Sequence, residues 1–287
     1  MWLGFSGANK NNSFIKSTIF DTFLPFRLLT YNQILYYNHR FLTPNYGIFN
    51  DMTNELKILN EIEKAVALCE KGYSHKEILD VLKTENDFEK QICLLKLDKI
   101  TNQEEANLLV FQLTEHHGLI REATAIKINE FAKNPNSVVF FKTEQILDSL
   151  LKAVNDINPN ICRLICDILP YVMENNIVEK QYFLNNLYKR FYEIFEELEK
   201  LKRSNWYTKK LFNLYWSLEA LGELKPNITE TLENILQKTA LFRDYTIREK
   251  TAMVLSLLEE TSMTLEKIKT KLKNDDNFYV KRFSQKF

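Results

Sequence analysis

The segments GLIREATAIKINEF (residues 118–131) and YTIREKTAMVLSLL (residues 245–258) share the pattern Ile-Arg-Glu-x-Thr-Ala. The pattern falls on residues 120–125 in the first segment and on residues 247–252 in the second. Each segment follows a polar turn and carries apolar residues at three- and four-residue steps, which predicts an amphipathic helix. Because one helical segment recurs far along the chain, the sequence predicts a structure built from repeats.

Looser copies of this helix begin at Asp87, Asn158, Asn205 and Asn277, each after a polar turn. Another amphipathic helix precedes the turns, as in TEQILDSLLKAV (residues 143–154) and TLENILQKTAL (residues 231–241). Successive second helices start roughly thirty to forty-six residues apart, a spacing typical of paired-helix repeats. Glycine and proline are scarce, at six each, which favours long helices with short connections. We therefore expect an all-α protein.

A turn with Asp or Asn, followed by an aliphatic residue, then Arg or Lys, then small and aliphatic residues, resembles the HEAT repeat. The resemblance covers residues from about 75 to 287 in about six copies; it is good at Ile120 and Ile247 and weak at Trp206. It implies an α-solenoid of about six helix-turn-helix repeats that share buried flanks. It also implies that the turn Asp or Asn pairs with Arg121, Arg248 or Lys281 of a neighbouring copy.

The first fifty-one residues differ from the rest, since they lack glutamate and show no helical period. From Met52 the sequence has the apolar spacing of a regular amphipathic helix. Two interpretations stay open: residues 1–51 are an irregular N-terminal extension, or Met52 is the true start and residues 1–51 are not native. In both, residues 52–287 are the HEAT-like helical repeat domain.

Charge and cysteine content restrict the class of protein. Basic and acidic residues balance at 38 each, with pI near 6.9, whereas proteins that neutralise phosphates usually carry a basic excess. The four cysteines lack the dense spacing of a secreted disulfide scaffold. No secretory signal and no unbroken apolar span stands out. We expect a cytoplasmic protein that does not span a membrane.

Groups that could carry chemistry are few. His116 and His117 are adjacent in a turn, where their side chains diverge, so a turn role is favoured over a metal site. Cys162 and Cys166 lie one helical turn apart among aliphatic residues, which favours buried, inert thiols over a metal or redox pair. The sequence predicts no catalytic, cofactor-binding or metal-binding residue, and hence no enzyme.

Aromatic residues are interleaved with basic residues between residues 182 and 216. Aromatic residues and arginine dominate binding hot spots, and the same combination can stack bases. The other interpretation is that these aromatics are large core residues between long helices. The candidate partner-binding residues are Trp206, Tyr207, Lys209, Lys210, Tyr215 and Trp216.

Two functions are compatible with such a chain. The first is a non-enzymatic scaffold that binds a protein or peptide along the concave surface of the solenoid, since repeats of this kind expose extended surfaces. The alternative is a glycosylase or DNA-binding protein resembling the DNA-alkylation-repeat family, which is also built from HEAT-like helix pairs. Neutral net charge disfavours nucleic acid as the partner.

Overall fold

The computed structural model describes residues 63–64, 66–84, 86–115, 117–201 and 205–286, and no strand lies within these ranges. The chain divides into two units, Met1–Ala67 and Leu68–Phe287. The first unit is described only at residues 63–64 and 66–67, which are helical. The boundary expected at Met52 lies outside the described residues and stays a prediction.

The helices of the second unit are short to medium in length, apart from two long ones in the middle of the sequence. In chain order they are α3 (His75–Val81), α4 (Asp87–Lys96), α5 (Gln103–Phe111), α6 (Gly118–Ala132), α7 (Glu144–Val154), α8 (Pro159–Met173), α9 (Ile177–Lys200), α10 (Asn205–Leu224), α11 (Glu230–Ala240), α12 (Tyr245–Leu257), α13 (Met263–Lys273) and α14 (Phe278–Ser284). Short 3-10 helices, η1 (Gln112–Thr114) and η2 (Val138–Phe141), lie in two of the connections.

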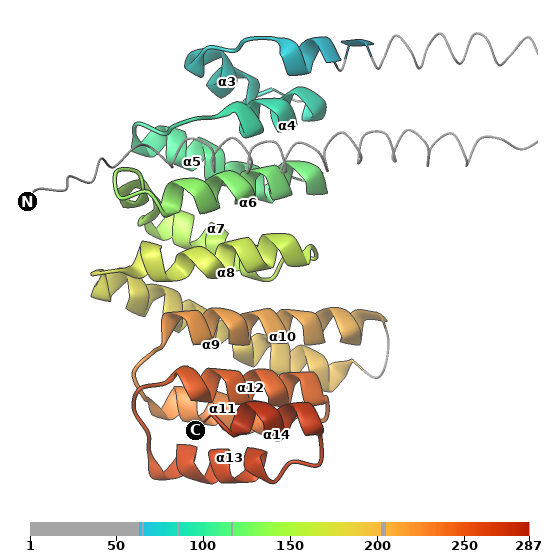
Figure 1. Ribbon diagram of the computed structural model, residues 1–287, viewed down its shortest axis with the longest axis vertical. Coiled ribbons are helices and arrows are strands. Elements are labelled where there is room, and N and C mark those ends of the chain that lie inside the picture. Colours follow the sequence, from blue (N-terminus) through green and yellow to red (C-terminus); the bar gives the residue numbers. More distant parts are fainter. Residues whose placement is uncertain (1–62, 65, 85, 116, 202–204, 287) are drawn as a thin grey trace, which may run out of the picture. The chain divides into compact units, whose positions relative to one another are not determined.

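These helices are arranged in pairs. Contacts join α3 to α4, α5 to α6, α7 to α8, α9 to α10, α11 to α12, and α13 to α14. The second helices, from α4 to α14, form one row in which each contacts the next, and the first helices from α5 to α13 form the other row. Figure 1 shows the pairs following one another in chain order. Residues 68–287 are therefore a helical repeat of the α-solenoid kind, and the all-α prediction is confirmed.

The sequence repeat that predicted this architecture is also a structural repeat. Ile120 and Ile247 are completely buried at the third position of α6 and α12. Thr124 and Thr251 are buried one turn later, and each hydroxyl donates to the carbonyl of that isoleucine at 2.8 Å. Because the threonine bonds within its own helix, its polar group is satisfied in the core.

Polar caps begin most of the second helices. The side chains of Asn86, Asn158, Asp244 and Asn277 accept hydrogen bonds from backbone N–H groups two or three residues later. Such a cap stabilises a helix by about 1 kcal/mol. Helix α6 departs from the pattern, since its cap residue His117 makes no side-chain cap. The expected capping by turn Asp or Asn is thus found at α4, α8, α12 and α14.

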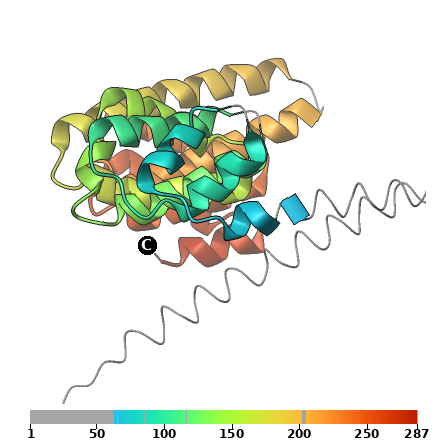
Figure 2. The same cartoon turned by 90° about the horizontal axis from the view of Figure 1, so that it is seen from above.

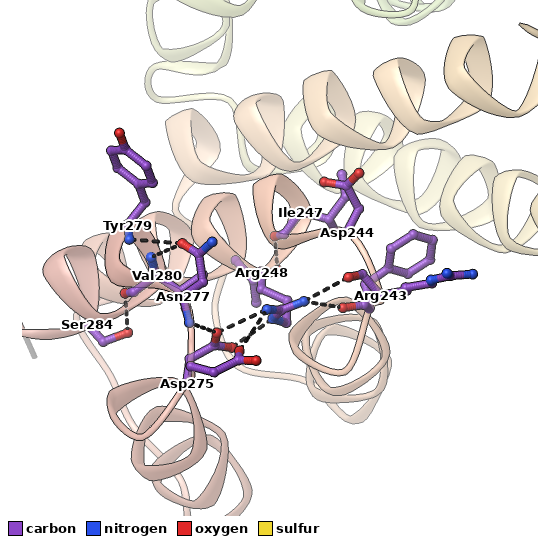
Figure 3. Close-up of polar contacts among 12 residues, drawn as sticks. Arg243, Asp244, Ile247, Arg248, Asp275, Asn277, Tyr279, Val280 and Ser284 are labelled. Carbon is purple, nitrogen blue, oxygen red and sulfur yellow. Dashed lines mark hydrogen bonds and ion pairs between the residues drawn. The ribbon is translucent and has the colours of Figure 1, made fainter.

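A side-chain ladder couples successive pairs through the fourth residue of the second helix. Figure 3 shows its contact at Arg248. In α12, the Arg248 guanidinium donates to both carboxylate oxygens of Asp275, at 2.7 and 3.0 Å, from the turn that precedes α14. It also donates to the carbonyls of Phe242 and Arg243 in its own turn, each at 2.9 Å. Asp275 in addition accepts from the backbone N–H of Asn277 at 2.9 Å. The arginine therefore fastens two consecutive turns together.

The same arrangement recurs in α6, 127 residues earlier in the sequence. Arg121 donates to Asp156 at 2.8 and 3.2 Å and to the Glu115 carbonyl at 2.9 Å, and Asp156 accepts from the Asn158 N–H at 2.8 Å. The predicted pairing of turn carboxylate and arginine is confirmed for Arg121 and Arg248. The resemblance implied that one turn residue both caps the helix and pairs with the arginine. In the structure two residues share these roles: asparagine caps the helix, and an aspartate two residues earlier accepts hydrogen bonds from the arginine.

Two further members of the ladder were not predicted. Lys90, the fourth residue of α4, lies 2.6 Å from Glu115 in the turn before α6. In α8 the fourth residue is Cys162, whose thiol lies 3.1 Å from the carbonyl of Asp156 in its own turn. Like the arginines, the cysteine contacts a carbonyl of the turn before its own helix. It has no cationic group that could bind a carboxylate in the turn before α10. The ladder is therefore interrupted between α8 and α10.

One continuous apolar core runs from Ile78 in α3 to Val280 in α14. Cys93 and Cys166 lie in it, and Cys162 is also buried, as predicted for Cys162 and Cys166. Burial raises the pKa of the Cys93 thiol to about 11 and that of Cys162 to about 12, and it raises the pKa of Cys166 well above its ordinary value of 9.0. None of the described helices is both long and apolar enough to cross a membrane.

Candidate partner-binding surface

The candidate residues all belong to α10, which has second helices on both sides and α9 as its pair partner. It contacts α8, α12 and α9. Figures 1 and 2 both show the end of α9 and the start of α10 extending beyond the ends of the neighbouring helices. The first turns of α10 are therefore flanked by fewer helices than its middle.

Trp206 and Lys209 are the most exposed of the six candidates. The Trp206 side chain is 61% exposed, and the Lys209 ammonium lies 5.2 Å from the centroid of its indole ring. Lys209 is exposed as well. A cation over an indole at this distance is a favourable contact of about 0.5–1 kcal/mol at an exposed site. The pair offers a flat apolar surface beside a positive charge.

The position of Trp206 on the helix explains why an exposed indole is unusual here. Asn213 and Ser217 follow it at seven and eleven residues, within about 20° of the same helix face, and both are buried. Trp206 thus continues the stripe that faces the core, past the point where neighbouring helices cover it. An indole in this position exposes apolar area that contact with a partner would bury.

The other four candidates are less available. Tyr207 is half-buried against the core, and Lys210 forms an ion pair with Glu197 of α9. Tyr215 and Trp216 also pack against the core, with their rings edge to face and 5.6 Å apart. The interpretation of the aromatics as core residues therefore describes Tyr215 and Trp216 better than it describes Trp206.

A cation from the neighbouring second helix also contacts the ring of Tyr215. The Lys250 ammonium of α12 lies 4.6 Å from the Tyr215 ring centroid and forms an ion pair with Glu219 of α10. Lys250 is 3% exposed, so its charge is neutralised inside the contact between α10 and α12. Tyr215 and Lys250 together hold these two helices against each other. Sequence reasoning missed Lys250 because its partners lie about thirty residues away.

The structure adds a second group of exposed aromatics, on the first turns of α12 and α14. The rings of Tyr245 and Tyr279 are stacked with centroids 6.2 Å apart, and Phe278 packs edge to face on Tyr279 at 5.6 Å. All three are exposed. Figure 3 shows Tyr279 directed away from the Arg248–Asp275 contact. The signal in the sequence was an aromatic residue directly after an Asp or Asn cap.

A pocket of about 450 Å³ lies at the other end of α10, and none of the candidate residues lines it. Its walls come from the C-terminal ends of α8 and α10 and from the segment after α12, and they include Met173, Glu174, Glu223, Lys225, Glu259 and Glu260. Burial and the carboxylates of Glu219 and Asp167 raise the pKa of Glu223. Within the described ranges, no cluster of His, Cys, Asp and Glu could hold a metal ion.

No protein-family profile and no curated protein matches the chain. Solved structures of designed proteins do. A designed armadillo repeat protein in complex with the peptide (KR)4 is 13% identical, with TM-score 0.48, over 75% of this chain and 98% of that chain. An engineered protein from a structural genomics consortium is 11% identical, with TM-score 0.47, over 75% of this chain and 95% of that one.

Proposed function

We propose that the chain is a non-enzymatic helical-repeat scaffold that binds a protein or peptide partner on the face formed by its second helices. The exposed start of α10 is the anchor of this surface, and Trp206 is its central residue. The observation that carries the proposal is the 61% exposure of an indole on a stripe that is otherwise buried. Tryptophan is enriched among residues that dominate binding energy, and Lys209 beside it can orient an acidic or polar group.

The stiffness of the surrounding helices supports this role. The start of α10 is fastened to α9 by the Lys210–Glu197 ion pair, and its later turns are fastened to α12 by Lys250. A preorganised surface loses little conformational entropy when a partner binds. Trp206 is therefore presented by a packed helix and not by a free loop.

A matched pair of substitutions tests the proposal. Phe111 at the end of α5 is also 61% exposed, and it lies outside α10. Partners recovered from the source cells on immobilised protein are expected to lose at least tenfold in yield with Trp206→Ala and to stay within twofold with Phe111→Ala. Equal recovery by both variants would remove Trp206 from the site. Recovery of duplex DNA in place of a protein would contradict the proposed partner class.

A further inference from the structure

The last helix pair carries a local excess of positive charge, although the chain as a whole is neutral. Between residues 262 and 286 the exposed cations are Lys267, Lys271, Lys273, Lys281, Arg282 and Lys286, and the exposed carboxylates are Glu266 and Asp276. Glu259 and Glu260, also exposed, lie in the segment before α13. Glu266 is in part neutralised by Lys269 at 3.0 Å. Six exposed cations against two carboxylates make this pair a positive surface in a neutral protein.

Apolar side chains lie among these cations. Phe278 is 68% exposed and contacts Tyr279, which is half exposed, with ring centroids 5.6 Å apart. Lys281 and Arg282 follow in the next positions of the same helix, and both are exposed. The surface therefore combines charge with apolar area, which is the composition of a specific contact and not of a merely solvated face.

The ladder indicates which charge this surface accepts. The fourth residue of a second helix is Lys90 in α4, Arg121 in α6 and Arg248 in α12, and each binds a carboxylate from the following turn. The fourth residue of α14 is Lys281, and no described carboxylate forms an ion pair with it. Helix α14 thus repeats the cationic half of a contact that is completed elsewhere by Asp or Glu.

We infer that the surface formed by α13 and α14 docks an acidic segment of a protein partner. Carboxylates of that segment bind Lys281 and Arg282, and an apolar side chain packs on Phe278 and Tyr279. The inference rests on the proposed function in taking the partner to be a protein. A polypeptide is favoured over nucleic acid because the cations at the ladder position bind carboxylates at all three described contacts.

Three fluorescein-labelled probes distinguish the partner classes: a fifteen-residue peptide of Asp, Glu and Leu, its counterpart of Lys and Leu, and a fifteen-nucleotide oligo-dT. Binding to the full chain is measured by fluorescence anisotropy at low and high salt. The acidic peptide is expected to bind, more weakly at high salt because charge pairs at a surface are screened. The basic peptide is expected to bind at least tenfold more weakly.

A charge-matched pair of variants locates the site. Lys281→Glu with Arg282→Glu is expected to weaken the acidic peptide at least tenfold. Lys76→Glu with Lys99→Glu makes the same change in net charge at exposed residues of α3 and of the connection after α4 and is expected to change affinity less than twofold. If the first double variant is less stable, the Lys281→Gln and Arg282→Gln pair replaces it, with at least a fivefold loss expected.

Equal losses of affinity for the acidic peptide in both double variants would show that binding depends only on net charge, and would overturn the inference. Unchanged affinity in the Lys281 and Arg282 variants would also overturn it, as would tighter binding of oligo-dT through the same two residues. The Trp206→Ala variant separates this inference from the proposed function. If a partner is lost with Trp206→Ala but still binds the Lys281 and Arg282 variants, the proposed scaffold function stands and the inferred acidic docking surface is overturned.

Discussion

At the scale of single residues, the contacts that matter most are those in which one side chain serves two turns. Arg248 donates two hydrogen bonds to Asp275, and each of the two side chains also bonds a backbone group of its own turn. Both side chains are largely buried. Hydrogen bonds to charged groups stabilise by about 1.5–3 kcal/mol each when buried, more than an exposed ion pair does.

The pKa of Asp275 gives the pH dependence of this contact. Burial alone would raise that pKa, but hydrogen bonds from Arg248 and the Asn277 N–H outweigh it and hold the pKa below its ordinary value of 3.8. A carboxyl group with a lowered pKa stabilises the fold fully above the ordinary pKa and loses this effect as pH falls through the folded pKa.

Asp275→Asn is therefore expected to lower the free energy of unfolding by about 2 kcal/mol at pH 7. The difference from the parent protein should shrink as the pH falls from the ordinary carboxyl pKa through the lowered pKa of folded Asp275, because protonation then removes the charged contact from the parent. Urea unfolding at pH 7 and pH 3 measures both values. A difference that stays constant or grows at pH 3 would contradict the assignment.

Cysteine reactivity is a second property set by single residues. Cys69 is exposed, whereas Cys93, Cys162 and Cys166 are buried with raised thiol pKa values. Since the thiolate is the reactive form, one thiol per chain is expected to react promptly with Ellman's reagent at pH 8, and four in denaturant. Prompt reaction of Cys162 or Cys166 in the native protein, identified by peptide mapping, would disprove their burial.

At the scale of elements, each helix is defined by a polar cap, a buried stripe and a short turn. Ile161 at the third position of α8 is completely buried, and Ile157, four residues earlier in the turn, is 64% exposed. The two have the same chemistry and differ only in packing. They form a matched pair for measuring how much the buried apolar stripe of α8 contributes to the free energy of unfolding.

Ile161→Ala is expected to lower the free energy of unfolding by about 3 kcal/mol, because it removes buried methyl groups and leaves a cavity. Ile157→Ala, at the exposed position, is expected to change it by less than about 0.5 kcal/mol. Chemical denaturation of both variants, followed by circular dichroism, provides the comparison. Similar losses in the two would show that α8 begins in a different register.

The helices of this chain could be predicted because their signals are local. The recurring pattern at Ile120 and Ile247 is readable in a few residues, and both segments are helices in the structure. The ladder was predicted in part through its arginines. Its lysine and cysteine members were missed because residue type alone does not show that Lys90 and Cys162 occupy the arginine position.

The candidate surface could be predicted less well, since exposure depends on which neighbours cover a helix. Trp206 and Trp216 look alike in the sequence, yet the first is exposed and the second packs on the core. The difference comes from how far α10 extends past its neighbours, which depends on the lengths of α8 and α12. The aromatic group at Tyr245 and Tyr279 was missed for the same reason, because their stacking joins separate repeats.

At the scale of the whole repeat unit, residues 68–287 are held together by contacts between neighbouring pairs. Several ion pairs also join neighbouring helix pairs. Lys90 pairs with Glu115 before α6, Lys133 after α6 pairs with Asp167 of α8, and Lys250 of α12 pairs with Glu219 of α10. Each therefore joins consecutive pairs, as expected where every repeat contacts only its neighbours.

Zero-length carbodiimide crosslinking followed by mass spectrometry tests this organisation most directly, because the reagent joins a lysine to a carboxylate already in contact. Within residues 68–287 of the monomer, we expect links from Glu115 to Lys90, from Asp167 to Lys133 and from Glu219 to Lys250. We expect every abundant link to join residues of the same or adjacent helix pairs. Abundant intramolecular links that skip a pair, such as from α4 to α10, would contradict a stack of paired helices.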